Sequence, residues 1–219
     1  MLLSEFDFPF DPALVADHPV MPRHEARLLV MDRSSHGRMH RRVADLPLLL
    51  QSGDLIVVNN TKVMPARVPG RTRSTGKLLD LLFVQDLGQG LWEVLIKGRF
   101  KPGALIDFSG GGCGEIVERS QARTTVKVTG VTSVYDLMHA TGTMPLPPYI
   151  KREPSQDDQQ WYQTMFAQQE GAIAAPTAGL HFTPHLVEAL TAKGIELAQV
   201  TLHVGPGTFR SVKSDRIEE

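Results

Sequence analysis

The chain has 219 residues, a formal net charge of −1 and a pI of about 6.7. Hydrophobic residues make up 42% of it and charged residues 21%, which is close to globular usage of about 45–50% and 25% and argues against a disordered chain. No apolar run approaches the roughly 20 residues of a membrane helix, and the acidic N-terminus lacks the basic and apolar regions of a signal peptide. We therefore expect a folded, cytoplasmic protein.

A single cysteine, Cys113, limits the chemistry that thiols can provide. It excludes an intrachain disulfide and a zinc site made of several cysteines. Its surroundings, residues 109–114, are rich in glycine and typical of a turn. We therefore expect no nucleophilic role for it.

Basic residues cluster in two stretches of the sequence. Between Asp54 and Asp80 there are five bases and no acid, and residues 23–42 hold six arginines against Glu25 and Asp32. Such runs are typical of surfaces that bind nucleic acid, but an ordinary solvated surface also produces them. Charge alone leaves both interpretations open.

The first segments along the chain predict a strand, a turn, a helix and a second strand. The composition of residues 26–32 predicts a strand, and 33–37 have turn composition. A short helix is predicted over 46–50 with Asp45 as its N-cap. The apolar run 54–58 then predicts a buried strand.

From about residue 66 to residue 142 the sequence consists of short β segments at the 8–12-residue spacing of an all-β unit. Glycines or a Lys-Pro-Gly turn separate most of them. A closed barrel would leave no edge strand, so we predict a small inserted antiparallel β-barrel. Its candidate strands are 77–85, 91–97, 104–108, 115–118 and 124–128.

Prolines end the β pattern at residues 144–150 and predict an extended return crossing. A helix is then predicted over 157–168, where its aromatic and methionine side chains are spaced for core packing. The class that follows is α/β: a mixed sheet with helices, interrupted by the small barrel. We assign 1–65 and 150–219 to the α/β domain and 66–149 to the barrel.

The last fifty residues predict a strand–helix–strand unit. The strands are 171–175 and 195–204, and the helix begins after an N-cap at Thr183 and ends before Gly194. A right-handed crossover makes the two strands parallel, so the loops that follow them lie at one sheet edge. Open α/β sheets bind their ligands at that edge.

Three loops follow predicted strands, at 59–67, 176–182 and 203–209. If the strands share one sheet, these loops frame one pocket with hydroxyls, basic groups and imidazoles, which suits an anionic ligand that also has a polar ring. The groups concerned are Thr61, Thr177, Thr208, Lys62, Arg67, His181 and His203.

Each element of this pocket also has a simpler interpretation. Gly205 and Gly207 lack the third glycine of a dinucleotide motif and could form a plain turn. The histidines are either structural or proton-transfer groups. His181 and His185 lie on either side of a helix start, so they predict no metal site.

Several stretches resemble, in the same order, motifs of the S-adenosylmethionine:tRNA ribosyltransferase-isomerases of queuosine biosynthesis. The longest are Asn-Asn-Thr-Lys-Val-Met-Pro-Ala-Arg at 59–67 and Val-Thr-Leu-His-Val-Gly-Pro-Gly-Thr-Phe at 200–209. Three others are Met-Pro-Leu-Pro-Pro-Tyr-Ile at 144–150, Tyr-Gln-Thr at 162–164 and Ala-Ala-Pro-Thr-Ala-Gly-Leu-His-Phe at 174–182. The resemblance runs through nearly the whole chain.

The resemblance implies an α/β domain interrupted by a small β-barrel. It also implies an enzyme that uses S-adenosylmethionine as a ribosyl donor and forms epoxyqueuosine on 7-aminomethyl-7-deazaguanine at the tRNA wobble position, releasing adenine and methionine. S-adenosylmethionine is then a substrate, and no cofactor or metal is expected. We expect a monomer that has tRNA as its macromolecular partner and does not bind a membrane.

For this reaction, the loop positions of His181 and His203 make them the candidate bases. Arg71, Arg73 and Lys77 are expected to contact tRNA. The residues expected to bind S-adenosylmethionine and the modified base are Asn60, Thr61, Lys62, Pro65, Arg67, Tyr149, Thr177, Ala178, Gly179, Leu180, Phe182, Gly205, Gly207, Thr208 and Phe209.

Two departures from the family pattern qualify these expectations. The family usually has Gly-Gly-Lys-x-Glu where this chain has Thr-Gly-Lys-Leu-Leu at 75–79, followed by Asp80. Family members also continue beyond the position that corresponds to Glu219. The alternative expectation is a truncated, inactive homologue that acts at most as an RNA-binding module.

Overall fold

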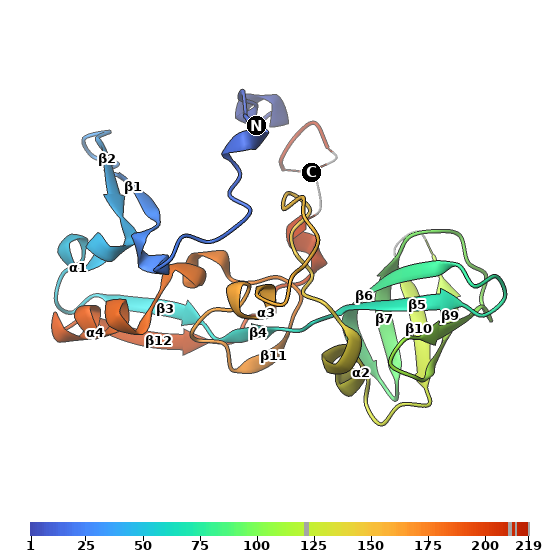
Figure 1. Ribbon diagram of the computed structural model, residues 1–219. Helices are drawn as coiled ribbons and strands as arrows, with labels where there is room; N and C mark the ends of the chain where they lie inside the picture. The colour runs from blue at the N-terminus through green and yellow to red at the C-terminus, as the bar shows by residue number, and fades with distance from the viewer. Residues whose placement is uncertain (121–122, 210–211, 213, 219) are drawn as a thin grey trace.

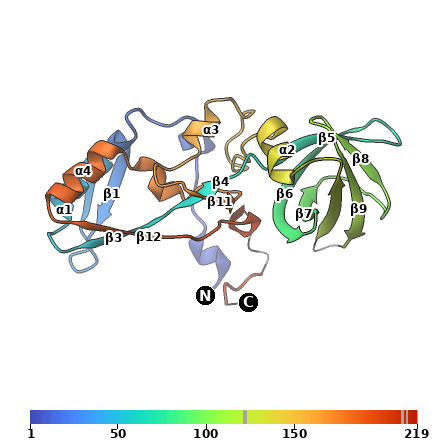
Figure 2. The same cartoon turned by 90° about the horizontal axis from the view of Figure 1, so that it is seen from below.

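The computed structural model describes residues 1–120, 123–209, 212 and 214–218. Figure 1 shows an α/β half and a barrel at opposite ends of the molecule, with strands β4 (Thr61–Val63) and β11 (Gln169–Ala172) between them. Figure 2 shows the same order from below. Parallel strand pairs, helices and a closed antiparallel barrel confirm the predicted α/β class.

The α/β half is built on a parallel pair, β3 (Leu55–Asn59) and β12 (Glu196–Val200). Helix α4 (Pro184–Ala192) packs Leu186 and Leu190 into a small core beside this pair. Thr183 caps α4 by accepting a hydrogen bond from the Leu186 amide at 3.3 Å, as predicted. No helix in the part of the chain that the structure describes is long and apolar enough to cross a bilayer.

A second α-helix and two strands complete this half. Helix α1 (Leu46–Leu49) lies against α4. The predicted N-cap Asp45 is wrong, because its carboxylate instead accepts a hydrogen bond from the Arg42 amide at 2.9 Å. Strands β1 (Arg27–Met31) and β2 (Arg38–Arg42) form an antiparallel hairpin. The sequence did not predict β2, since it buries no side chain and therefore has no apolar alternation.

The predicted pairing of the last two strands is wrong. β11 pairs in parallel with β4, whereas β12 pairs with β3, so the strands belong to two separate two-stranded sheets. β12 leaves its sheet after Val200 because the Asn59 side chain binds both the amide and the carbonyl of Leu202, at 3.1 and 2.8 Å. One backbone hydrogen bond, from the Ile173 amide to the Val204 carbonyl, still links the two chain segments.

The helix predicted over 157–168 is one turn long, α3 (Asp158–Trp161). Beyond Trp161 the side chain of Gln163 binds both the amide and the carbonyl of Val63, at 3.1 and 2.7 Å. This contact draws the chain towards β4 and stops the helix. The remaining short turns are 3-10 helices at Leu3–Phe6, Pro12–Leu14, Arg23–Glu25, Val43–Asp45, Thr177–His181 and Pro206–Phe209.

The barrel closes in the order β10-β7-β6-β5-β8-β9. All five predicted segments are strands of it: β6 (Leu78–Gly88), β7 (Leu91–Ile96), β8 (Leu105–Phe108), β9 (Cys113–Arg119) and β10 (Thr124–Thr129). The sixth strand, β5 (Arg67–Thr72), was not among the candidates because Pro69 and Gly70 are unfavourable in a strand. Fully buried residues fill the interior, among them Trp92, Phe83, Leu81, Ile106, Ile116 and Val126.

Helix α2 (Val134–Thr141), which the sequence did not predict, packs on the barrel next to β5 and is capped by Ser133. The chain then returns through Thr143, whose amide and carbonyl pair with Arg67 at 2.9 and 3.2 Å. Gly142 makes this approach possible, since a Cβ there would lie 1.8 Å from the Pro65 carbonyl oxygen. The chain therefore enters and leaves the barrel side by side.

Gly142→Ala tests that close approach. We expect it to lower the free energy of unfolding by about 3 kcal/mol, because the atoms it meets are backbone and cannot turn aside. Gly207→Ala is the matched control, since a Cβ at Gly207 meets nothing within 4 Å. Urea unfolding of both variants decides the point, and equal stability would contradict the packing described here.

Candidate functional site

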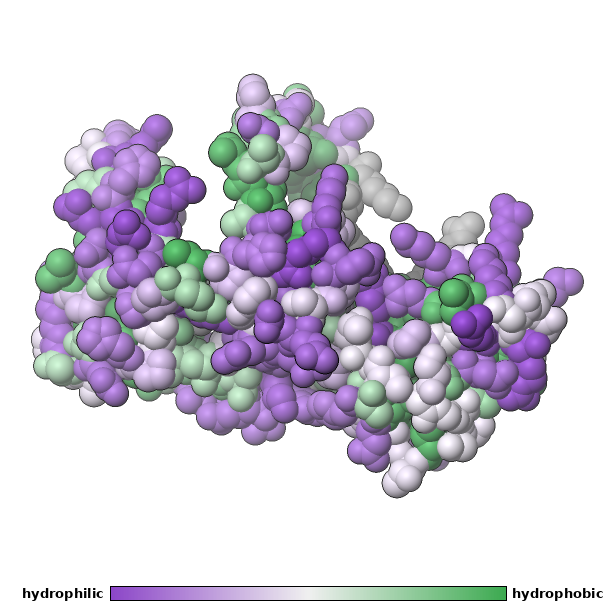
Figure 3. All heavy atoms as spheres, viewed as in Figure 1, coloured by the Kyte–Doolittle hydropathy of each residue, from purple (hydrophilic) through white to green (hydrophobic). Residues whose placement is uncertain are grey.

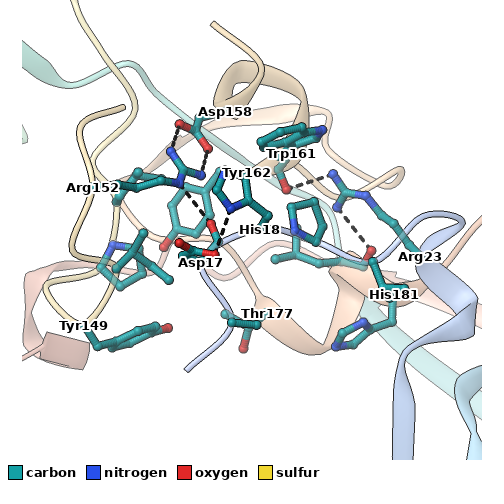
Figure 4. Close-up of a pocket in the computed structure, with 17 residues that line it drawn as sticks. Asp17, His18, Arg23, Tyr149, Arg152, Asp158, Trp161, Tyr162, Thr177 and His181 are labelled. Atoms are coloured by element: carbon teal, nitrogen blue, oxygen red, sulfur yellow. Dashed lines mark hydrogen bonds and ion pairs between the residues drawn. The ribbon is translucent and has the colours of Figure 1, made fainter. Parts of the chain in front are cut away.

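A cavity of about 320 Å³, called the first cavity below, lies between the N-terminal segment and α3 (Figure 4). Its walls are mostly apolar and aromatic, with His18 and Trp161 in edge contact at 5.6 Å between ring centroids. Of the residues expected at the site, it is lined by Tyr149, Thr177, Leu180 and His181. A concave, aromatic surface with a few polar groups is the usual form of a small-molecule site.

Arg23 holds one wall of this cavity in place. Its guanidinium donates to four backbone carbonyl oxygens, those of Gln160, Trp161, Gln163 and Leu180, at 2.8 to 3.3 Å. The first three lie in the last residues of α3 or just beyond them, and the carbonyls at the end of a helix lack helical partners. Burial lowers the pKa of Arg23, but a guanidinium remains charged at neutral pH. No pattern in the sequence distinguishes this internal arginine from the arginines of a basic surface.

Arg152 and Asp158 form the opposite wall, as Figure 4 shows. They make a bidentate pair with both distances at 2.7 Å, and Asp158 is only 1% exposed. The hydrogen bond from Arg152 lowers the pKa of Asp158, against the opposing effect of burial, and the Ser155 amide adds a bond of 2.7 Å. Arg152 also donates to the Asp17 carbonyl at 3.0 Å, which fixes the N-terminal segment over the cavity.

The hydroxyl of Tyr162 is the unsatisfied polar group of the first cavity. Tyr162 is 7% exposed, and its oxygen has no hydrogen-bond partner of normal geometry among the described residues. Burial raises its pKa to about 12, against a smaller opposing effect of the Ala175 backbone. A buried hydroxyl without a partner costs about 1–3 kcal/mol, and a polar atom of a ligand could remove that cost.

His181 ends the 3-10 turn Thr177–His181 at the edge of the first cavity. Partial desolvation lowers the pKa of its imidazole; a hydrogen bond with the Arg23 backbone opposes this effect, and the positive charge of Arg23 adds to it. The ring is therefore neutral at pH 7 and can accept a proton.

A second cavity of about 400 Å³ lies where the barrel meets β11. Trp92 of the barrel, Tyr135 of α2, and Glu170, His203 and Gly205 line it. The Nδ1 atom of His203 lies 2.8 Å from the hydroxyl of the fully buried Thr61. The tautomer of the ring decides which of the two atoms donates the hydrogen bond. The ring rests directly on Gly171, where a Cβ would come within 2.6 Å of it.

Glu170 was not predicted and is the central charge beside the second cavity. Its carboxylate binds the Lys62 ammonium at 2.8 Å and the His139 ring at 3.2 Å. The pKa of Glu170 is lowered: desolvation acts to raise it, but the bonds to Lys62 and His139 together outweigh that effect. In the sequence Glu170 appears only as an isolated acid before a predicted buried strand.

The structure divides the expected site residues between two cavities, so the prediction of one pocket framed by three loops is wrong. The loops 59–67 and 203–209 meet at the second cavity, while 176–182 belongs to the first. The reason is that β11 pairs with β4 and not with β3 or β12, so the loop after β11 lies at α3 while the loop after β12 lies beside the barrel.

The other expected residues lie around these cavities. Asn60 is buried and accepts from the Thr201 hydroxyl at 2.7 Å, and Pro65 is buried where the barrel begins. Arg67 pairs with Asp80 at 2.8 Å. Asp80 is the acid that follows Leu79, at whose position the family usually has a glutamate, so it holds a residue expected at the site. Phe182 packs on Phe166 with ring centroids 5.6 Å apart.

The small residues of the expected set form turns. Ala178 and Gly179 belong to the turn Thr177–His181, and Gly207 and Thr208 to the turn Pro206–Phe209. The side chain of Phe209 lies outside the described part of the structure.

The residues expected to contact tRNA lie on or just after β5. Arg71 and Arg73 are exposed, as is Lys77. Arg73 pairs with Asp107 at 2.5 Å. Among the described residues no cluster of three His, Cys, Asp or Glu side chains could hold a metal ion.

These features define an α/β protein that carries a small barrel and has ligand-sized cavities, one beside α3 and one where the barrel meets β11. The family model described as queuosine biosynthesis protein matches residues 3–219, and the chain belongs to this family.

Three curated relatives are named S-adenosylmethionine:tRNA ribosyltransferase-isomerase. The chain is 41% identical to that of Aquifex aeolicus over 221 residues, 40% to that of Citrifermentans bemidjiense over 222 and 42% to that of Desulfitobacterium hafniense over 223. Each alignment covers 100% of this chain, which spans 65–66% of the length of these relatives. A crystal structure of S-adenosylmethionine tRNA ribosyltransferase from Thermotoga maritima is 28% identical, with 92% of this chain and 59% of that chain covered and a TM-score of 0.39.

Asp158→Asn tests the wall of the first cavity. Removing one charge of a buried pair leaves the other uncompensated, so we expect a loss of about 3 kcal/mol at pH 7. Because the folded pKa of Asp158 lies below its ordinary 3.8, the stability it adds is present above pH 3.8 and is lost as pH falls through the folded value. Urea unfolding at pH 7 and in acid, with the exposed neighbour Asp157→Asn as control, should show the difference shrinking in acid.

Proposed function

We propose that the chain binds S-adenosylmethionine and tRNA and takes part in transferring and isomerising the ribosyl group onto 7-aminomethyl-7-deazaguanine at the wobble position. Adenine and methionine leave, and epoxyqueuosine-tRNA forms. Family membership over residues 3–219, with relatives named for this reaction, is the observation that carries the proposal. S-adenosylmethionine is consumed as a substrate, so the reaction needs no resident cofactor, and it takes place in the cytoplasm with tRNA.

The first cavity suits the adenosine part of S-adenosylmethionine. Its aromatic side chains, Tyr149, Trp161 and Tyr162, offer surfaces on which a purine can stack, and base stacking on an aromatic ring is worth about 1–3 kcal/mol. The unpartnered Tyr162 hydroxyl and the Thr177 side chain provide polar contacts at the same wall. Polar groups of this kind orient a ligand that the apolar surface binds.

A base is needed because the sulfonium acidifies the neighbouring C5′ hydrogens, and removal of one of them begins the rearrangement. His181 is neutral at pH 7 and lies at the edge of the first cavity. His203 has one ring nitrogen occupied by Thr61, and with the Nδ1 proton donated there its Nε2 lone pair is available. Both histidines therefore meet the electronic requirement for a base.

The exposed bases on and after β5 would face tRNA. Arg71 and Lys77 have no ion-pair partner among the described residues. Arg73 would exchange the carboxylate of Asp107 for a phosphate, which a guanidinium binds with the same fork geometry.

The Tyr162→Phe variant separates the effect of the Tyr162 hydroxyl on protein stability from its effect on S-adenosylmethionine binding. Without ligand we expect a gain of about 1 kcal/mol, because the substitution removes an unsatisfied buried hydroxyl and keeps the ring. S-adenosylmethionine should bind about fivefold to tenfold more weakly, since one hydrogen bond is lost. Calorimetric titration and thermal unfolding measure the two effects. Tyr135→Phe, away from the first cavity, should change neither, and weaker stability of Tyr162→Phe would contradict the unpartnered hydroxyl.

His181→Ala and His203→Ala test the base. Loss of a general base lowers turnover about 100-fold or more, measured as adenine released from S-adenosylmethionine with precursor-bearing tRNA. His185→Ala, on the exposed face of α4, is the control. If His181 is the base, activity persists below pH 6.5 and falls only as pH drops through its lowered pKa. Unchanged turnover in both variants excludes both residues, and tRNA binding without adenine release favours an RNA-binding module.

A further inference from the structure

The β1–β2 hairpin concentrates positive charge on a chain that is otherwise acidic. Residues 27–42 contain five arginines and one acid. The whole chain has 23 basic and 24 acidic residues, which leaves 18 against 23 elsewhere. Figure 1 shows the hairpin projecting from the α/β half at the end away from the barrel, and Figure 3 shows a mostly hydrophilic surface over it.

Most of these arginines have no internal partner. Arg27, Arg33, Arg38 and Arg41 form no ion pair within the described ranges, and the one hydrogen bond among them joins Arg41 to the His40 carbonyl. By contrast, Arg42 is held by the Glu25 carboxylate at 3.2 Å. The charge of the hairpin is therefore available to a partner outside the chain.

The only acid of the hairpin organises its turn. Asp32 accepts from the hydroxyl and the amide of Ser34 at 2.6 and 2.8 Å and from the Ser35 amide at 3.3 Å. The Ser34 hydroxyl, followed by the two amides, lowers the pKa of Asp32 to about 2. This carboxylate thus shapes the tip and is not paired with any of the arginines.

The strand register sets like charges opposite each other. Arg27 faces Arg42, and directly opposed like charges destabilise a pair of strands. Within the described part of the chain the hairpin pairs only with itself, and a lone two-stranded hairpin is marginal in water. Every residue of β2 is exposed, so its arginines add nothing to the core. An anionic partner would relieve this repulsion.

We infer that the β1–β2 hairpin is an RNA-binding arm whose arginines contact the phosphate backbone of tRNA. The inference rests on the proposed function, which supplies the polyanion. Leu29 and Met31, 52% and 65% exposed, lie on the same side of the hairpin as Arg27 and Arg38 and can contact sugars or bases between the phosphates. The basic stretch at 62–77 is less available, because Lys62, Arg67 and Arg73 are already paired with acids.

The test removes three unpartnered charges together, as Arg33→Gln/Arg38→Gln/Arg41→Gln in the 219-residue chain. Binding of a tRNA transcript is measured by filter retention over a range of salt concentrations. Each lost phosphate contact lowers the slope of log Kobs against log salt by about 0.7–0.9, so the slope should fall by about 2–3. Affinity should fall about 10- to 100-fold at 0.1 M salt.

The matched control is Arg33→Lys/Arg38→Lys/Arg41→Lys, which keeps the charges and should keep the salt slope. Thermal unfolding checks that the Gln variant remains folded, as expected for exposed side chains. An unchanged slope in the Gln variant, an equal loss in the Lys variant, or no tRNA binding by the unchanged chain would overturn the inference. Binding to phosphatidylserine vesicles in place of tRNA would overturn it too. Adenine release is assayed separately: its failure removes the proposed function but not a hairpin-dependent change in tRNA binding.

Discussion

One extended segment, residues 55–72, fixes the arrangement of the whole molecule. It pairs first with β12, then with β11 and finally with its neighbours in the barrel. Asn59 and Asn60 hold the point where the partner changes: Asn59 binds the Leu202 backbone, and Asn60 binds the side chains of Gln199 and Thr201. A slip of one residue here would turn every later side chain to the opposite face, so these two amides hold the register for both cavities.

The change of partner explains why the site is divided. A continuous sheet would bring the loops after β3, β11 and β12 to one edge, as open α/β sheets do. Here the segment turns towards the barrel, and the loop after β12 follows it, so that His203 rests on Gly171 beside barrel residues. The loop after β11 stays with α3, where the Arg23 guanidinium binds the Leu180 carbonyl. Buried polar contacts, rather than the order of strands, therefore decide which residues share a cavity.

Features that depend on local sequence could be predicted, and those that depend on distant partners could not. The five barrel segments and the Thr183 cap follow from alternation, glycine turns and capping chemistry, which act over a few residues. The length of α3 and the partner of Glu170 depend on groups about 100 residues away or more, the Val63 backbone and the Lys62 side chain among them. β5 was missed for the opposite reason, since Pro69 and Gly70 argue locally against a strand that only barrel closure explains.

The same distinction separates charges that look alike in the sequence. Arg23 and Arg27 belong to one basic run, yet Arg23 is desolvated and donates to four carbonyls while Arg27 faces another arginine in solvent. Removing Arg23 would leave carbonyls at the end of α3 without donors, which is a structural loss, whereas the charge of Arg27 is not needed for packing. Basic residues indicate a nucleic-acid surface only after those that the fold itself uses have been set aside. In this chain that step leaves Arg71 and Lys77 of the strip at 62–77 and four arginines of the hairpin without an ion-pair partner among the described residues.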